Sequence, residues 1–221
     1  TRDGYTFNGW YTASSGGTKI TENSTVSITA AQTLYAQWTI KQYTFTLGSA
    51  TGVSTSGSTT SGKKNYNATI TLKATVSTGY TWNKWSSSNT SLVADMTAAN
   101  TTFAMPEGDI TMTPVVTAHV YSIQYNGNGH TNGSMSNTSH TYGTAKKLRK
   151  NTLTRAGYEF LGWSTTKNGE VEYTDEESVV NLTATNNATV TLYAIWKPLS
   201  QMFIWHDGAW HRALRYVYVT S

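Results

Sequence analysis

Two segments of this chain occur twice, and this repetition limits the folds that the chain can adopt. TRDGYTFNGW at 1–10 returns as TRAGYEFLGW at 154–163, and LYAQW at 34–38 returns as LYAIW at 192–196. A weaker copy, GYTWNKW, lies between them at 79–85. The Gly-Tyr pairs of the three copies are 75 and 78 residues apart, which is too long for one solenoid turn and long enough for a small domain. We therefore expect a tandem array of small domains.

The repeated Gly-Tyr-x-Phe-x-Gly-Trp segment has the alternation of a β-strand with one buried face. Tyr158 and Phe160 share one face, Gly157 suits a turn that needs a positive φ, and Gly162 inside the strand predicts a bulge or a close backbone approach. The closing segment at 192–196 alternates in the same way. Aromatic side chains dominate the burial of small β domains, so we interpret these two segments as core strands that pair or pack against each other, and their aromatic residues as structural.

The complete set of motifs resembles a known family, the Listeria–Bacteroides repeat, which is related to the internalin B-repeat. The residues that carry the resemblance are Y-x-I-x-Y-N-G-N-G at 121–129, T-Y-G at 141–143, the 154–163 segment and T-L-Y-A-I-W at 191–196. Residues 43–117 resemble the divergent branch of the family, although Trp82 stands in place of the usual Phe and Pro114-Val-Val in place of the usual closing strand.

The resemblance implies a β-rich α+β fold, in which small β-grasp-like (ubiquitin-like) repeat domains with at most one short helix are strung in tandem. It also implies a place in secreted or cell-surface proteins of bacteria, with no catalytic residues and no cofactor to transfer. The chain has no starting Met and no signal peptide, so we expect it to be a piece of a longer protein, and its export rests on the resemblance.

Comparison of the copies divides the chain into four parts. The first part should be only the second half of a repeat, because it has no counterpart of the opening hairpin at 121–142, and its core should therefore lack covering strands. The parts are a half-repeat at 1–40, a divergent middle repeat at 41–118, a complete repeat at 119–198, and a C-terminal aromatic hairpin at 199–221.

Composition agrees with an extracellular β-rich protein. The absence of Cys excludes disulfides and thiolate metal sites, and a charged fraction of 13% with abundant Thr, Ser, Asn and Gly is typical of β-rich surface proteins. No run of about 18 apolar residues is present, so we expect no membrane span. We expect a bacterial cell-surface or secreted location, and a virion is the alternative.

A cluster of basic residues lies between the opening hairpin and the Gly-Tyr strand, where the short helix is expected. The cluster indicates a solvated helix face or a contact with an acidic cell-wall polymer. Nucleic acid is not an expected partner, because the basic residues are not interleaved with exposed aromatic residues. The acidic run at 175–177 fits a loop or helix start better than a catalytic carboxylate pair. The basic residues are Lys146, Lys147, Arg149 and Lys150.

The C-terminal hairpin is predicted from Asp207-Gly208, the strongest short hairpin signal, between two β-type runs. This turn would pair Trp205 with Trp210, and His206 and His211 would share the opposite face, where two ligands without a third do not predict a metal site. The aromatic face could stack on sugar rings or a partner protein, cap the array, or give strands from 202–218 to the half-repeat of the same or a neighbouring chain. That face comprises Phe203, Trp205, Trp210 and Arg212.

Three classes of function fit these features. The first is a non-enzymatic spacer and adhesion scaffold, whose partners would be neighbouring repeats, a host-surface protein or glycan, or an acidic wall polymer. The second is the receptor- or carbohydrate-binding part of a phage tail or appendage protein. The third is an accessory domain of an extracellular enzyme. No catalytic motif such as Gly-x-Ser-x-Gly or His-Glu-x-x-His is present, so we do not expect an enzyme, a cofactor or a metal.

Overall fold

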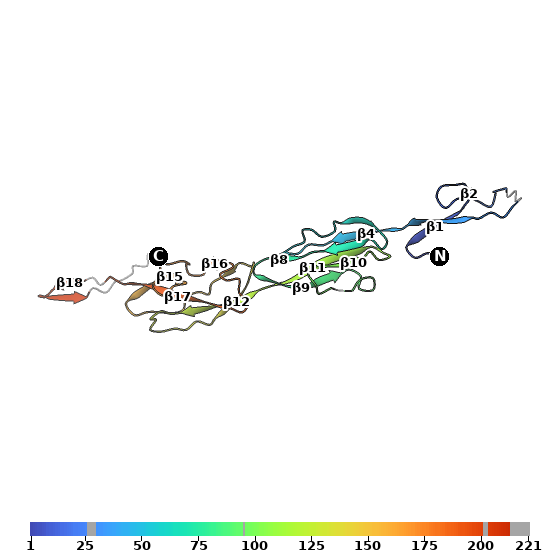
Figure 1. The fold of residues 1–221 in the computed structure, drawn as a ribbon. Coiled ribbons are helices and arrows are strands. Elements are labelled where there is room, and N and C mark those ends of the chain that lie inside the picture. The colour runs from blue at the N-terminus through green and yellow to red at the C-terminus, as the bar shows by residue number, and fades with distance from the viewer. Residues whose placement is uncertain (26–29, 95, 201–202, 213–221) are drawn as a thin grey trace. The chain divides into compact units, whose positions relative to one another are not determined.

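Every regular element in the described part of the chain is a β-strand (Figure 1). The computed structural model describes residues 1–25, 30–94, 96–200 and 203–212. The chain divides into two units, Thr1–Ala118 and His119–Ser221, which are called unit 1 and unit 2 below. The β-rich content is confirmed, but the expected α+β class is wrong, because these described ranges contain no helix.

The expected short helix around the basic cluster is replaced by a strand, β14. Its two residues pair with β16, since Lys146 lies opposite Val179 and Lys147 lies opposite Ser178. The next residue, Leu148, is buried in the core, and its backbone N–H donates to the Glu177 carbonyl at 2.8 Å. The pairing with β16 satisfies the backbone hydrogen-bonding groups of this segment. Leu148 is the one apolar residue that anchors the segment, so the segment has no amphipathic stripe that would bury a helix here.

The complete repeat folds around a mixed four-stranded sheet in the order β13-β12-β17-β15. The two central strands, β12 and β17, run parallel, and the outer pairs are antiparallel. The register of β15 on β17 shifts between Phe160 and Gly162, which confirms the predicted bulge. The strands are β12 (Val120–Asn126), β13 (Thr138–Thr141), β14 (Lys146–Lys147), β15 (Tyr158–Ser164), β16 (Ser178–Val179) and β17 (Thr189–Pro198).

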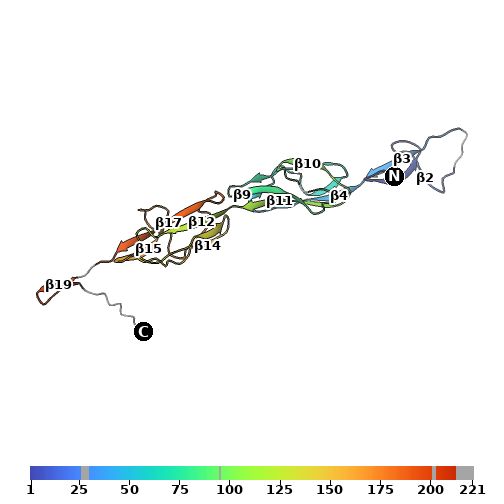
Figure 2. The ribbon, with the colours of Figure 1, turned by 90° about the horizontal axis from the view of Figure 1, so that it is seen from below.

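The middle repeat has the same strand connections around its main sheet, in the order β6-β4-β11-β9 (Figure 2). Here β4 and β11 form the parallel central pair, and β9 carries the Trp-containing segment antiparallel to β11. Two further two-stranded sheets, β10-β7 and β5-β8, complete it. The strands are β4 (Gln42–Leu47), β5 (Val53–Ser54), β6 (Gly62–Asn65), β7 (Thr69–Leu72), β8 (Thr75–Val76), β9 (Tyr80–Ser87), β10 (Thr101–Ala104) and β11 (Ile110–Ala118).

In its described residues, the half-repeat contains the counterparts of β15 and β17 and one short further strand, β2. Its sheet has the order β2-β1-β3, formed by β1 (Tyr5–Tyr11), β2 (Lys19–Ile20) and β3 (Tyr35–Ile40). The register of β1 on β3 shifts between Phe7 and Gly9, at the position that corresponds to the bulge of β15. The predicted pairing of the two repeated segments is therefore confirmed in both copies.

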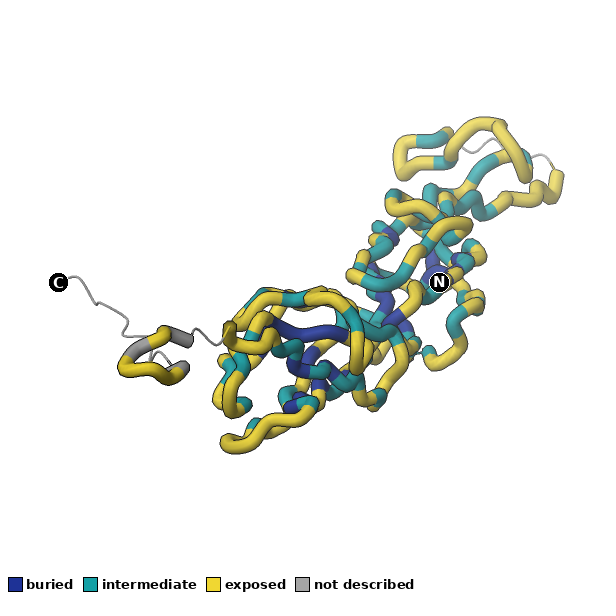
Figure 3. Tube along the Cα trace, turned by 90° about the vertical axis from the view of Figure 1, so that its left-hand side faces the viewer, coloured by how far each residue is buried: buried dark blue, intermediate teal, exposed yellow. Residues whose placement is uncertain are grey.

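Two hydrophobic cores are buried in the described residues, one in the middle repeat and one in the complete repeat (Figure 3). Each core contains the Trp of the repeated motif, Trp85 or Trp163. In the described part of the half-repeat, only Gly4 is buried. The half-repeat therefore has the strands of a repeat without its covered core.

The C-terminal hairpin forms the predicted antiparallel pair of β18 (Phe203–His206) and β19 (Ala209–Arg212). Trp205 lies opposite Trp210 and His206 lies opposite Ala209, as the Asp207-Gly208 turn predicts. Asp207 and Gly208 both have positive φ, at 52° and 77°, which is the backbone geometry of a type I′ turn. The expected strands beyond residue 212 lie outside the described residues.

Candidate functional site

The repeated aromatic motif forms the core of the two full repeats. Trp85 and Trp163 are fully buried, and Trp163 is in edge contact with Tyr125 at 5.0 Å and with Phe160 at 5.1 Å between ring centroids. Trp85 is anchored in addition by a hydrogen bond from its indole N–H to the Ala99 carbonyl at 3.0 Å. These residues hold the sheet together and cannot reach a ligand.

The same motif is exposed in the half-repeat. Phe7 lies 5.0 Å from Trp38 and 5.8 Å from Trp10, so the aromatic cluster itself is preserved. However, Phe7 is 45% exposed and Trp10 is 49% exposed in this copy. The alternation of the motif predicted a core position for these residues, and only the absence of an opening hairpin indicated that they form a surface.

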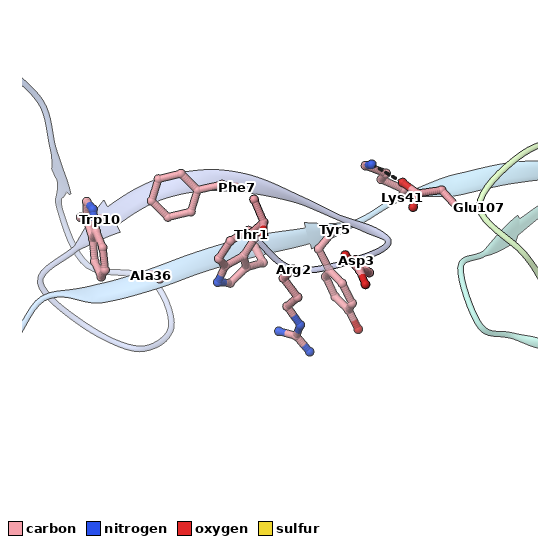
Figure 4. Close-up of a pocket in the computed structure, with 10 residues that line it drawn as sticks. Thr1, Arg2, Asp3, Tyr5, Phe7, Trp10, Ala36, Lys41 and Glu107 are labelled. Carbon is pink, nitrogen blue, oxygen red and sulfur yellow. Dashed lines mark hydrogen bonds and ion pairs between the residues drawn. The ribbon is translucent and has the colours of Figure 1, made fainter.

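These aromatic residues line an open cavity in unit 1, with a volume of about 670 Å³. Figure 4 shows Phe7 and Trp10 on β1 above Ala36 of β3, and the Lys41–Glu107 ion pair at the other end of the cavity. We call this cavity the aromatic groove. Its lining residues are Thr1, Arg2, Asp3, Tyr5, Phe7, Trp10, Ala36, Trp38, Lys41 and Glu107.

At the polar end of the aromatic groove, Lys41 and Glu107 form a network with Tyr43, which does not itself line the groove. The Glu107 carboxylate accepts hydrogen bonds from the Lys41 ammonium at 2.5 Å and from the Tyr43 hydroxyl at 3.0 Å. The hydrogen bond from Lys41 lowers the pKa of Glu107, and the same bond raises the pKa of Lys41. Both charged side chains remain solvent-exposed, so the pair orients this end of the groove and adds little stability.

A second polar feature of the groove is a cation–π contact. The Arg2 guanidinium lies 3.8 Å from the centre of the Tyr5 ring. The complete repeat has the same contact between Arg155 and Tyr158, at 3.9 Å. Because both copies keep it, the contact belongs to the repeat scaffold, where it fixes the entry of the chain into the strand.

The predicted basic surface is exposed, but the fold places acidic residues beside it. All four basic residues, Lys146, Lys147, Arg149 and Lys150, are exposed. The pairing of β14 with β16 brings the acidic run at 175–177 alongside them, and the Asp175 carboxylate accepts a hydrogen bond from the Asn151 N–H at 2.9 Å. The proximity of both signs weakens the local positive field. A contact with an acidic polymer stays a prediction.

The C-terminal hairpin presents Trp205 with 60% of its surface exposed. The side chains of the other predicted face residues, Phe203, Trp210 and Arg212, lie outside the described side chains, as do those of His206 and His211. The register places Trp205 and Trp210 opposite each other and Phe203 opposite Arg212. The use of this face as a ligand surface stays a prediction.

His140, which the sequence motifs did not indicate as a notable residue, is 1% exposed. Its ring stacks on Tyr121 with centroids 5.5 Å apart, and Nε2 lies 3.1 Å from the Thr138 hydroxyl oxygen. Burial, with a smaller contribution from the positive charge of Lys146, lowers the pKa of His140. A buried ring of this kind favours the neutral form. The sequence signal was the alternation of β13, which turns His140 towards the sheet interior.

The described residues contain no group of three or more His, Cys, Asp or Glu side chains that could hold a metal ion. In the same residues, no helix is long and apolar enough to cross a membrane.

The carboxylate with the most side-chain partners in the complete repeat, Glu172, accepts hydrogen bonds from Ser164 and Thr165. These hydrogen bonds lower the pKa of Glu172, and the bond from the Thr165 hydroxyl is the largest cause. They also bind the 165–171 loop to β15.

Comparison with known families assigns nearly all of the repeats. The profile of the Listeria-Bacteroides repeat domain matches residues 1–37 and 121–195, which together exceed half of the chain. The profile of the divergent InlB B-repeat domain matches residues 43–119. Among curated proteins, no sequence matches the chain.

Proposed function

Because the chain belongs to the Listeria-Bacteroides repeat domain family, we propose that it is a non-enzymatic spacer and adhesion scaffold within a bacterial secreted or cell-surface protein. Repeats of this family occur in surface and secreted proteins and are generally non-catalytic. The observation that carries the proposal is the full burial of Trp85 and Trp163. The Trp that the repeats share supports the fold and is inaccessible to a ligand in both full repeats.

The connections between successive repeats support a scaffold role. A single residue, Lys41, separates β3 from β4, and a single residue, His119, separates β11 from β12. Neither connection contains Gly or Pro, the residues that make a linker loose or kinked. Such connections suit a segment that holds a more specific module at a distance from the envelope.

The scaffold role can be tested by displaying a known binding module on a bacterial surface, with this chain between the module and its anchor. We expect the module to capture its target more efficiently than when a Gly/Ser linker of the same residue number replaces the chain, because a folded spacer keeps the module away from the envelope. A variant carrying Trp163→Ala, which weakens the complete repeat, should lose part of this advantage. Equal capture by the folded chain and the flexible linker would contradict the proposal.

The exposed Trp205 favours a second function, the binding of a receptor or carbohydrate by a phage tail or appendage protein, or by an accessory domain of an extracellular enzyme. Flat aromatic side chains stack on sugar rings and anchor protein interfaces. A glycan array probed with the wild-type chain, Trp205→Ala and the exposed-residue control Leu199→Ala would detect it. A spacer binds no glycan in any form, whereas a lectin-like hairpin loses binding only in Trp205→Ala.

A further inference from the structure

The glycine of the Gly-Tyr motif has the same local geometry in the half-repeat and in the complete repeat. The φ angle is 72° at Gly4 and 79° at Gly157. Each glycine carbonyl accepts a hydrogen bond from the N–H of the residue that follows the closing strand, which is Lys41 at 2.8 Å or Leu199 at 2.9 Å. The turn that the glycine allows is therefore the same in the two copies.

The surroundings of the two glycines differ. Gly4 is the one buried residue in the described part of the half-repeat, and a Cβ at this position would overlap the aromatic ring of Tyr66. At Gly157, no atom of the described residues outside the chain neighbours lies within 4 Å of the corresponding Cβ position. Gly4 is therefore required for the close approach of Tyr66 as well as for the turn.

Tyr66 belongs to the middle repeat and directly follows its edge strand, β6. Its backbone N–H donates to the Lys41 carbonyl at 2.9 Å. The complete repeat has a Tyr at the corresponding position, since Tyr142 directly follows β13 and its N–H donates to the His119 carbonyl at 2.8 Å. The ring of Tyr66 is thus held by a turn that both full repeats share.

Lys41 is the single residue that connects β3 of the half-repeat to β4 of the middle repeat. Its N–H donates to the Gly4 carbonyl and its own carbonyl accepts from the Tyr66 N–H, so each of its peptide planes is held by a different repeat. The φ and ψ angles of Lys41 lie between these planes and are the soft rotations of the connection. Neighbouring domains move relative to each other unless a contact restrains them, and the contact between Gly4 and Tyr66 spans both angles.

We propose that the packing of Tyr66 on Gly4 is a joint that fixes the half-repeat against the middle repeat, so that unit 1 behaves as one stiff segment. Gly4 supplies an open backbone surface, and Tyr66 supplies the ring that covers it. The joint is an interface between successive repeats, whose partner is the next repeat of the same chain. The use of this stiffness rests on the proposed spacer function, whereas the joint itself can be measured in the chain without a spacer assay.

The experiment measures the distance between two spin labels by pulsed electron paramagnetic resonance. The full chain has no Cys, so Lys19→Cys on β2 and Thr46→Cys on β4, both at exposed positions, place one label on each repeat. Gly4→Ala and Tyr66→Ala then disrupt the joint from opposite sides. The matched controls are Tyr66→Phe, which keeps the ring, and Gly157→Ala, which makes the same change at an equivalent turn with open space.

We expect a single narrow distance peak in the labelled chain, in Tyr66→Phe and in Gly157→Ala. Gly4→Ala and Tyr66→Ala should both lose this peak and give a broad distribution, because rotation about Lys41 is then unrestrained. Hydrogen exchange of the β1 and β4 amides should stay unchanged in Tyr66→Ala, which separates loss of the joint from unfolding.

A narrow peak in Tyr66→Ala, or a broad distribution in the labelled chain without further substitution, would overturn the proposal. Broadening in Gly4→Ala alone would also overturn it, since strain in the turn would then be the cause. Broadening that appears only together with lost protection of β1 or β4 would overturn it in favour of unfolding. A narrow peak that depends on Tyr66, in a chain without advantage in the display assay, would contradict the spacer function and support the joint.

Discussion

Truncation of the motif Trp to Ala should lower the free energy of unfolding by different amounts in the half-repeat and in the complete repeat. Trp10→Ala and Trp163→Ala remove the same side chain from the same position of two matching segments. The first Trp is 49% exposed and the second is fully buried. The pair therefore separates the contribution of burial from the contribution of local sequence.

The magnitudes follow from the area that each indole removes from water. A fully buried Trp buries up to about 250 Å², and at about 25 cal/mol per Å² its truncation costs roughly 5 kcal/mol, after allowance for the methyl group that Ala keeps. This value lies at the upper end of the range of about 3–5 kcal/mol for Trp→Ala in a core. Trp10 buries about half of this area and leaves no closed cavity, so its truncation should cost about 2 kcal/mol.

Native-state hydrogen exchange in low denaturant measures both values in the full chain. The amides of β15 and β17 report the opening free energy of the complete repeat, and those of β1 and β3 report that of the half-repeat. Each substitution should lower the value in its own repeat and leave the other unchanged, since the two sites belong to different units. Equal losses for Trp10→Ala and Trp163→Ala would refute the reasoning that the half-repeat core is uncovered.

Three further results are expected. Urea unfolding of unit 2 should show lower stability at about pH 5.5 than at about pH 7.5, and His140→Phe should remove the difference. The reason is that the pKa of His140 in the folded protein lies below the ordinary 6.5, so that at the lower pH the unfolded chain binds more protons than the folded one. A carboxyl NMR titration should give Glu107 a pKa below its ordinary 4.5, and Lys41→Met should return it towards that value, because the Lys41 hydrogen bond is the main cause. Gly162→Ala should lower the melting temperature of unit 2 more than Gly157→Ala. A Cβ at Gly162 would lie 2.5 Å from the Tyr173 carbonyl oxygen, whereas the space around Gly157 is open. At Gly157 the positive φ is the only cost, about 1–2 kcal/mol.

Local features of the strands could be predicted because they depend on neighbouring residues. The bulge at Gly162 and the positive φ of Gly157, which is 79°, follow from a glycine at a fixed place in an alternating segment. The register of the C-terminal hairpin follows from Asp207-Gly208, because a two-residue turn fixes which residues face each other. Each of these features needs only a few adjacent residues.

The expected helix at the basic cluster failed for the opposite reason. The resemblance implied a helix there, but the backbone groups of Lys146 and Lys147 are satisfied by β16, more than 30 residues later in the chain. No pattern in the neighbouring sequence indicates that distant partner strand. The burial of His140 also depends on distant residues, since its ring is enclosed by the sheet and by Tyr121.

The sequence by itself determined the repeat family, the pairing of the two repeated segments and the aromatic residues that build each core, because period and turn chemistry are local properties. The tertiary structure decided which copies of the motif are buried. Trp163 and Trp10 have the same neighbours in sequence, yet only Trp163 has a parallel strand to cover it. Burial is a property of the whole set of packed strands, so two matching segments became a core in one repeat and an open groove in the other.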